Sequence, residues 1–213
     1  MAVFLHYSEL TIEVFDDTTS THSANSSTLY DKVIQVEKDR QYSPNSQHAI
    51  KVRNGERVIK TGIILASGGG TGVDEESALI DQGNLIIRCC NKLFSLSLPE
   101  LDINWVIEPD QATCFSVHQY KDTYITHGEL SVARVDRSGK ELWRYGGADI
   151  FVCLDEGNPF EMRESHIALT DFNGSKYRID YDGNSLDYIE SDYLLQEPIT
   201  ILMESKKPWW KFW

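Results

Sequence analysis

The sequence lacks long apolar segments. No stretch of its 213 residues approaches the ~18 consecutive apolar residues that a membrane-spanning helix needs. The first nine residues, Met1 to Glu9, also lack the basic start and the extended apolar core of a secretory signal peptide. We therefore expect a cytoplasmic protein without an integral membrane segment.

Cysteine is scarce, and its spacing favours neither disulfides nor metal binding. The four thiols belong to Cys89, Cys90, Cys114 and Cys153, and no two of them form a C-x-x-C pair. Successive side chains of a strand alternate between its faces, so Cys89 and Cys90 are expected to point to opposite sides. This pattern is typical of reduced core cysteines in a cytoplasmic protein.

Basic residues are few relative to acidic ones. The chain has 20 Lys and Arg against 33 Asp and Glu, which gives a formal net charge of −13. A field of this sign repels nucleic acid and anionic membranes, so we expect no nucleic-acid partner. Two explanations of the acidity stay open: it keeps the protein soluble, or it complements a basic protein.

Signatures of enzymes and metal sites are missing as well. There is no Gly-x-Ser-x-Gly motif, which is the nucleophile elbow of many hydrolases. The six histidines show no metal-ligand spacing, and His118 and His127, which face each other only across a predicted hairpin, have no evident third ligand. We predict no enzymatic activity, no bound metal and no cofactor.

The glycine-rich loop from Ser67 to Val73 does not have the pattern of a nucleotide site. It resembles the Gly-Gly-Gly-Thr-Gly loop of tubulin-like GTPases, but it lacks the Gly-Lys-Ser/Thr ending of a P-loop. Three carboxylates, Asp74, Glu75 and Glu76, follow at once and would repel a phosphate. The loop is better interpreted as a connection between two β units.

What the sequence does contain is strand-like alternation separated by turn residues. Asn54-Gly55 between two alternating runs predicts a hairpin over 48–66. The first 15 residues read as a strand, and the only short helix compatible with the pattern lies at 191–196. Further strands are predicted at 78–81, 84–90, 92–98, 103–107, 113–119, 123–127, 129–136, 141–145, 149–154, 165–171 and 176–181.

A strand–turn–strand unit recurs within this β-rich part of the chain. The first copy, 93–105, closes on Trp105, and the second, 132–143, closes on Trp143. A degenerate third copy begins at Tyr177, and Asp187 and Tyr188 stand in for its tryptophan. The spacing of about 40 residues is that of four-stranded propeller blades, which stack because a single unit cannot bury its own faces.

The second copy, from Val132 to Trp143, resembles the quinoprotein-type (PQQ-like) propeller repeat. That repeat has an aliphatic-Asp-x-x-Gly-Lys-x-x-Trp run, and its tryptophan docks between neighbouring blades. The first copy departs from it at Pro99 and Glu100, where the turn glycine would fall. A ring that holds the quinone has roughly six to eight blades, and this chain has room for about four or five, so the cofactor site is not carried over.

We therefore predict an all-β fold of repeated antiparallel β-meander units, arranged as a small or incomplete β-propeller-like stack. The expected organisation is a single β domain over 1–213. It would comprise N-terminal strands and a hairpin in 1–66, repeats in 78–188, and an aromatic and basic tail in 204–213.

A second resemblance bears on function. The segments 47–52, 68–73, 127–130 and 143–151 are similar to those of an uncharacterised family of small bacterial cytoplasmic proteins of immunity type. The resemblance implies a non-catalytic protein-binding module, in its most concrete form an immunity-like protein that neutralises a basic toxin or nuclease. The carboxylates that we expect to bind this partner lie at or near turns between strands: Asp74, Glu75, Glu76, Glu129, Asp149, Asp155 and Glu156.

The last eight residues differ in character from the rest of the chain. They combine three lysines, Lys206, Lys207 and Lys211, with four aromatic residues. Such a segment suits a membrane interface or a groove on a partner, or it packs back as a final strand. The alternative function is therefore a scaffold or sensor that docks to a membrane or a protein complex through this tail, with Trp209, Trp210 and Trp213 as its contact residues.

Overall fold

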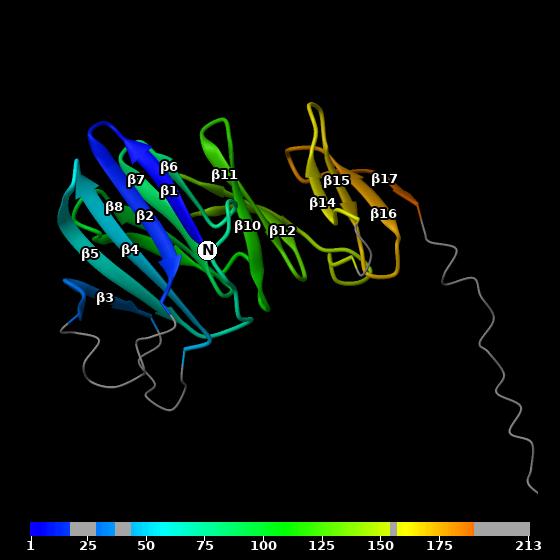
Figure 1. Cartoon of the computed structure of the whole chain (residues 1–213). Coiled ribbons are helices and arrows are strands. Elements are labelled where there is room, and N and C mark those ends of the chain that lie inside the picture. Colours follow the sequence, from blue (N-terminus) through cyan, green and yellow to red (C-terminus); the bar gives the residue numbers. More distant parts are fainter. Residues whose placement is uncertain (18–28, 37–43, 154–156, 190–213) are drawn as a thin grey trace, which may run out of the picture.

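The fold of this chain consists of strands and their connections. The computed structural model describes residues 1–17, 29–36, 44–153 and 157–189, and all seventeen elements in these ranges are β-strands. They form one five-stranded sheet and three four-stranded sheets, which follow one another across the molecule (Figure 1). No helix in the described ranges has the length and apolar character needed to cross a membrane. The predicted all-β class is confirmed.

The five-stranded sheet, called the N-terminal sheet below, has the strand order β1-β2-β4-β5-β3. The predicted hairpin over 48–66 is confirmed as β4 and β5, which turn at Gly55 with a φ of 57°. The single strand expected over the first 15 residues is instead a hairpin that turns at Ser8, and β3 runs parallel to β5. The bounds are β1 Ala2–Tyr7, β2 Leu10–Asp16, β3 Lys32–Gln35, β4 Ser46–Asn54 and β5 Arg57–Ala66.

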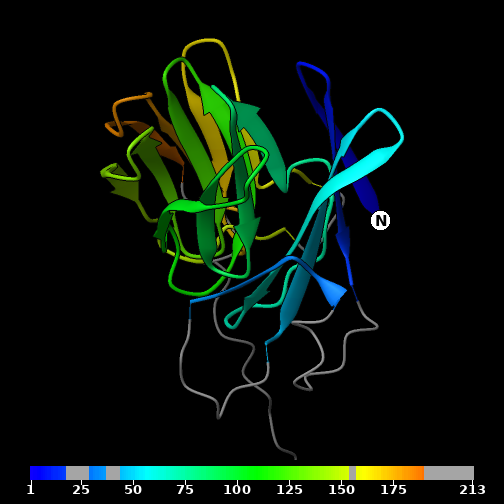
Figure 2. The ribbon, with the colours of Figure 1, turned by 90° about the vertical axis from the view of Figure 1, so that its left-hand side faces the viewer.

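The other three sheets are antiparallel meanders, each with its strands in sequence order, and are called blades 1, 2 and 3. They confirm the repeated meander units and the propeller-like stack. Figure 2 shows the blades from the side, with the N-terminal sheet next to them. Blade 1 comprises β6 Ala78–Asp81, β7 Asn84–Cys89, β8 Lys92–Ser97 and β9 Ile103–Ile107; blade 2 comprises β10 Cys114–Tyr120, β11 Thr123–Gly128, β12 Val132–Asp136 and β13 Glu141–Tyr145; blade 3 comprises β14 Phe160–Met162, β15 Ile167–Thr170, β16 Lys176–Ile179 and β17 Ser185–Ile189.

Two local expectations are wrong. The strand predicted at 149–154 is not formed by residues 149–153, because their backbone bonds to turns of the adjoining blades: Phe151 N donates to Glu129 O and Phe172 N donates to Ile150 O. Cys90 lies in a turn with a φ of 57°, so its side chain enters the same buried cluster as that of Cys89. The short helix considered at 191–196 lies outside the described residues.

Each tryptophan of the repeat docks on the following blade, as the resemblance implied. Trp105 Nε1 donates to Arg137 O at 2.9 Å, and its ring covers Gly139. Trp143 Nε1 donates to Tyr181 O at 3.0 Å, and its ring covers Gly183. Both glycines have a φ of 84°, and a Cβ at either one would lie 2.7 Å from the indole. The Asp-x-x-Gly turn therefore needs glycine for its conformation and for the close approach of the ring.

Strand register shows what replaces the tryptophan in blade 3. Trp105 lies opposite Ser95, and Trp143 lies opposite Arg134. In each blade the register shifts at a bulge directly after this serine or arginine. Asp187 lies opposite Arg178, beside the same bulge. Asp187 thus takes the tryptophan position, and its carboxylate pairs with Arg178 at 3.1 Å.

The face that each blade turns toward the next blade, called its leading face, changes from apolar to charged along the stack. Cross-strand partners share one face of a sheet, so the same seven register positions define the leading face of each blade. The leading faces of blades 1 and 2 pack against blades 2 and 3, respectively. That of blade 3 is mainly charged, as in the capping unit of a repeat protein. In register order the positions hold Leu79, Ile86, Arg88, Leu93, Ser95, Trp105 and Ile107 in blade 1, His118, Ile125, His127, Val132, Arg134, Trp143 and Tyr145 in blade 2, and Glu161, Ala168, Thr170, Lys176, Arg178, Asp187 and Ile189 in blade 3.

Candidate functional site

A cleft of about 470 Å³ lies where the connection from the N-terminal sheet meets blades 1 and 2. Its size is within the range of small-molecule and side-chain binding sites. Residues from two inter-sheet connections and three strands line it, so no single stretch of sequence builds it. The lining residues are Gly70, Thr71, Gly72, Asp74, Glu76, Arg88, Phe115, His127, Phe151, Val152, Cys153, Asn158 and Pro159.

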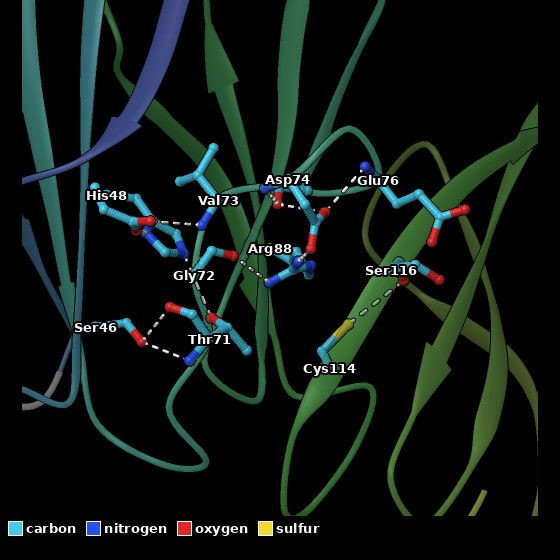
Figure 3. A network of polar contacts seen from close by, with 12 residues as sticks. Ser46, His48, Thr71, Gly72, Val73, Asp74, Glu76, Arg88, Cys114 and Ser116 are labelled. Atoms are coloured by element: carbon cyan, nitrogen blue, oxygen red, sulfur yellow. Dashed lines mark hydrogen bonds and ion pairs between the residues drawn. The ribbon is translucent and has the colours of Figure 1, made fainter. Parts of the chain in front are cut away.

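The glycine-rich loop is fastened to the N-terminal sheet (Figure 3). Thr71 N donates to Ser46 Oγ at 2.7 Å, and Ser46 Oγ donates to Thr71 O at 2.8 Å. Val73 N donates to Asp16 Oδ2 at 2.9 Å. On the blade side, a Cβ on Gly69 would lie 1.7 Å from Thr113 Oγ1, so only glycine fits there. This packing agrees with the interpretation of the loop as a connection.

A buried ion pair fixes the end of this connection. The Arg88 side chain is 2% exposed, and its Nη2 donates to Asp74 Oδ2 at 2.5 Å while Nη1 donates to Gly72 O at 3.2 Å. Asp74 Oδ1 also accepts from Glu76 N at 3.0 Å and from Ser77 Oγ at 2.9 Å. Asp74 therefore neutralises the guanidinium and shapes the turn that carries the next two carboxylates.

Glu75 and Glu76 are the carboxylates of this turn that remain available. Both side chains are exposed, and neither forms an ion pair with another described residue. Glu76 lines the cleft and Glu75 does not. The predicted acidic turn thus has three members with different roles: Asp74 is structural, Glu76 faces the cleft and Glu75 lies beside it.

Aromatic and imidazole rings form the opposite wall. His127 stacks on Phe160 with ring centroids 4.9 Å apart and lies 5.4 Å from the ring of Phe115. Its Nε2 is 3.1 Å from Phe151 O. Burial lowers the pKa of His127 to about 4, so this imidazole is uncharged at neutral pH.

Burial disfavours the thiolate form of two of the cysteines, Cys89 and Cys114. None of the four cysteines forms a disulfide. Burial raises the pKa of Cys114 to about 12 and raises that of Cys89 well above its ordinary value. No group of three or more His, Cys, Asp or Glu side chains in the described ranges is arranged to hold a metal ion.

Two further predicted site residues have structural hydrogen bonds. Glu129 Oε2 accepts from Thr113 Oγ1 at 2.8 Å, and Asp149 Oδ2 accepts from Asn173 Nδ2 at 2.6 Å. Neither residue lines the cleft. The remaining predicted site residues lie outside the described residues: Asp155, Glu156, Trp209, Trp210 and Trp213.

Sequence reasoning missed the residues that give the cleft its walls. Arg88, Phe115, His127 and Phe151 come from separate strands and connections that only the stacking of the sheets brings together. One signal was available, namely Arg88 within the apolar run Leu85 to Cys90, because a charge in such a run is buried only with a partner.

Comparisons with known proteins reveal similarity of fold. No protein-family model matches this sequence, and no curated protein matches it. Among solved structures, BamB from Moraxella catarrhalis has a TM-score of 0.48 at 11% identity, covering 88% of this chain and 63% of that one. The AfRom2 CNH domain has a TM-score of 0.47 at 13% identity, covering 90% and 54%. A europium-containing methanol dehydrogenase has a TM-score of 0.42 at 16% identity, covering 57% and 24%. This chain thus spans less than two thirds of each of these proteins.

Proposed function

We propose that the protein is a non-catalytic binding module whose partner is a basic protein. The observation that carries the proposal is the pair Glu75 and Glu76, two exposed carboxylates without an ion pair in the described part of the chain, at the mouth of a cleft. The bond from Asp74 to Arg88 holds their turn in place. On a chain with a net charge of −13, such a pair attracts cationic surfaces and raises the rate of encounter.

The titratable groups around the cleft support a role without catalysis. The imidazole of His127 is uncharged and lies against Phe151 O, and the Cys114 thiol is buried. A thiol acts as a nucleophile in its thiolate form, and burial disfavours that form in Cys114.

The finer form of the proposal is an immunity-like protein that neutralises a basic toxin. Its test is co-expression of this chain with a basic toxin encoded immediately upstream of its gene. Restored growth with the native chain, and loss of that rescue on replacing Glu75 and Glu76 by glutamine, would support this form. Growth arrest despite a soluble native chain would contradict it.

The broader proposal is tested by binding of a fluorescent octa-arginine peptide, with affinity measured by anisotropy over a salt series. We expect the affinity to fall steeply as salt rises, and to fall in the double variant Glu75→Gln/Glu76→Gln. The matched control is Glu9→Gln/Glu56→Gln, which removes the same charge from exposed positions of the N-terminal sheet. Equal losses in the two variants, or an affinity independent of salt, would contradict a specific acidic site.

The alternative, docking through the C-terminal tail, gives the opposite result in a deletion test. Removing residues 206–213 would abolish binding if the tail were the contact segment, and it would leave octa-arginine binding unchanged if the acidic turn is the site.

A further inference from the structure

We infer that the cleft accepts a single cationic side chain, an arginine or a lysine, from the basic partner. The inference rests on the proposed function and specifies how the partner is anchored. It follows from the chemistry of the two sides of the cleft and from the balance of charge within it.

One side of the cleft suits the stem of a long side chain. Phe115, Phe151, Val152 and Pro159 give it an apolar lining. Phe151 is fully buried, whereas Phe115 is half-buried and retains exposed ring surface. Arginine and lysine place their methylene stems along such surfaces while the charged head stays near water, and a cation over an aromatic face gains further attraction.

The other side carries the charge that would bind the head group. Glu76 is exposed at the rim without an ion pair in the described residues. His118 of blade 2 interacts electrostatically with Glu76, and burial lowers the pKa of His118, so this imidazole is uncharged at neutral pH. His118 therefore adds no positive charge beside Glu76 that would oppose a cationic head group.

The balance of charge in the cleft excludes an anionic ligand. Arg88, the only cation among the described residues of the lining, is neutralised by Asp74 at 2.5 Å. His127 adds no positive charge at neutral pH, because its pKa is about 4. With Asp74, Glu76 and Arg88 as its charged groups, the lining has a net charge of −1 (two carboxylates and one guanidinium). A carboxylate or phosphate placed there would meet two carboxylates, whereas a guanidinium or ammonium would neutralise the net negative charge of the lining.

The test uses n-butylguanidinium as the probe and n-butylurea as its uncharged counterpart, with binding followed by amide chemical shifts of the whole chain. We expect n-butylguanidinium to shift amides of residues that line the cleft, and n-butylurea to shift them far less. Glu76→Gln should weaken binding about fivefold, as expected for one accessible ion pair. Glu75→Gln is the matched control. It removes an equal charge at the neighbouring residue, whose side chain does not line the cleft.

A second variant tests the apolar wall. Phe115→Leu keeps an apolar side chain at a half-buried position, so the fold is retained, and it removes the aromatic face. Weaker n-butylguanidinium binding by Phe115→Leu, at unchanged unfolding midpoint, would support the inference.

The outcomes separate this inference from the proposed function. If octa-arginine binds with steep salt dependence but n-butylguanidinium shifts no cleft amide, the acidic surface stands and the cleft inference is overturned. Equal effects of Glu76→Gln and Glu75→Gln on n-butylguanidinium overturn it as well. If octa-arginine does not bind even at low salt, the proposed function itself fails.

Discussion

Asp187 occupies in blade 3 the register position that Trp143 occupies in blade 2. Each lies opposite an arginine of the preceding strand, Arg178 and Arg134 respectively, and in each strand the bulge comes immediately before it. Trp143 reaches the next blade, where its Nε1 donates to Tyr181 O, whereas Asp187 pairs with Arg178 of its own blade. At this position a contact between successive blades is replaced by an ion pair within one blade.

The first prediction concerns the tryptophan contact. Trp143→Ala should lower the free energy of unfolding by about 3 kcal/mol, because it removes a half-buried indole and its hydrogen bond to blade 3. The control is Leu142→Ala at the neighbouring, 45% exposed position, for which we expect a change within about 0.5 kcal/mol. Urea unfolding measures both variants, and equal losses would contradict the assigned role of Trp143.

The second prediction compares two glycines with positive φ. Gly139→Ala should destabilise the protein more than Gly55→Ala, since a Cβ at Gly139 would lie 2.7 Å from the Trp105 ring while a Cβ at Gly55 has no heavy atom within 4 Å. Both variants incur the backbone strain of about 1 kcal/mol, so the difference between them reports the steric contact with the tryptophan. Thermal unfolding measures both variants, and equal midpoints would contradict the close contact between the Trp105 ring and Gly139.

The third prediction concerns the buried ion pair. Asp74→Asn should cost about 3 kcal/mol, because it leaves the buried Arg88 guanidinium without a carboxylate. Arg88→Met should cost less, since the methionine fills a similar volume and the freed Asp74 carboxylate is 50% exposed. Chemical denaturation of the two single variants checks the order, and a larger loss for Arg88→Met would contradict it.

The fourth prediction concerns pH. Burial lowers the pKa of His127 from 6.5 to about 4, so the unfolded chain binds this proton more readily than the folded chain does. Its contribution is fully present above pH 6.5, decreases as the pH falls, and is lost below about pH 4, a change of about 3 kcal/mol. The pKa of His48 is also lowered, mainly by burial, and its contribution has the same sign.

Denaturant unfolding between pH 7 and pH 4 measures this dependence. His127→Leu should reduce the slope in that window, while part of the slope stays because His48 and His118, whose pKa values are also lowered by burial, are unchanged. The turn carboxylates Asp136 and Asp180 have lowered pKa values, so their contributions disappear only at lower pH and do not obscure the test. An unchanged slope in His127→Leu would contradict the assignment.

The sequence predicted the turns between strands, because their hydrogen bonds join residues that are close together in the chain. The turns at Asp136 and Asp180 form because each carboxylate accepts hydrogen bonds from backbone amides two and four residues further on. In the first repeat Leu101, with a φ of 58°, takes the conformation that glycine has in the others, which the sequence pattern did not indicate. Leu101 is fully buried in the hydrophobic core, and this burial offsets the cost of a backbone conformation that is unfavourable for leucine.

Residues whose partners lie far along the chain were not predictable in the same way. β14 is only three residues long, from Phe160 to Met162, and carries too little alternation to be recognised without its partner strand β15. The cleft combines Glu76, Arg88, Phe115 and Phe151, which become neighbours only when the N-terminal sheet and blades 1 and 2 are packed together. The acidic turn was visible in the sequence, and the wall that it faces was not.

The charged leading face of blade 3 makes the two ends of the stack of sheets different from each other. The N-terminal sheet covers blade 1 at one end, and blade 3 presents Arg178 and Asp187 at the other, so both end units are specialised while blade 2 carries complementary surfaces on both sides. A duplicate of blade 2 inserted between blades 2 and 3 would find the indole of the preceding copy for its own Gly139 turn and would offer its own indole to Gly183. We therefore expect an additional blade to be accepted between blades 2 and 3, whereas after blade 3 it would meet a face that is mainly charged in the described residues.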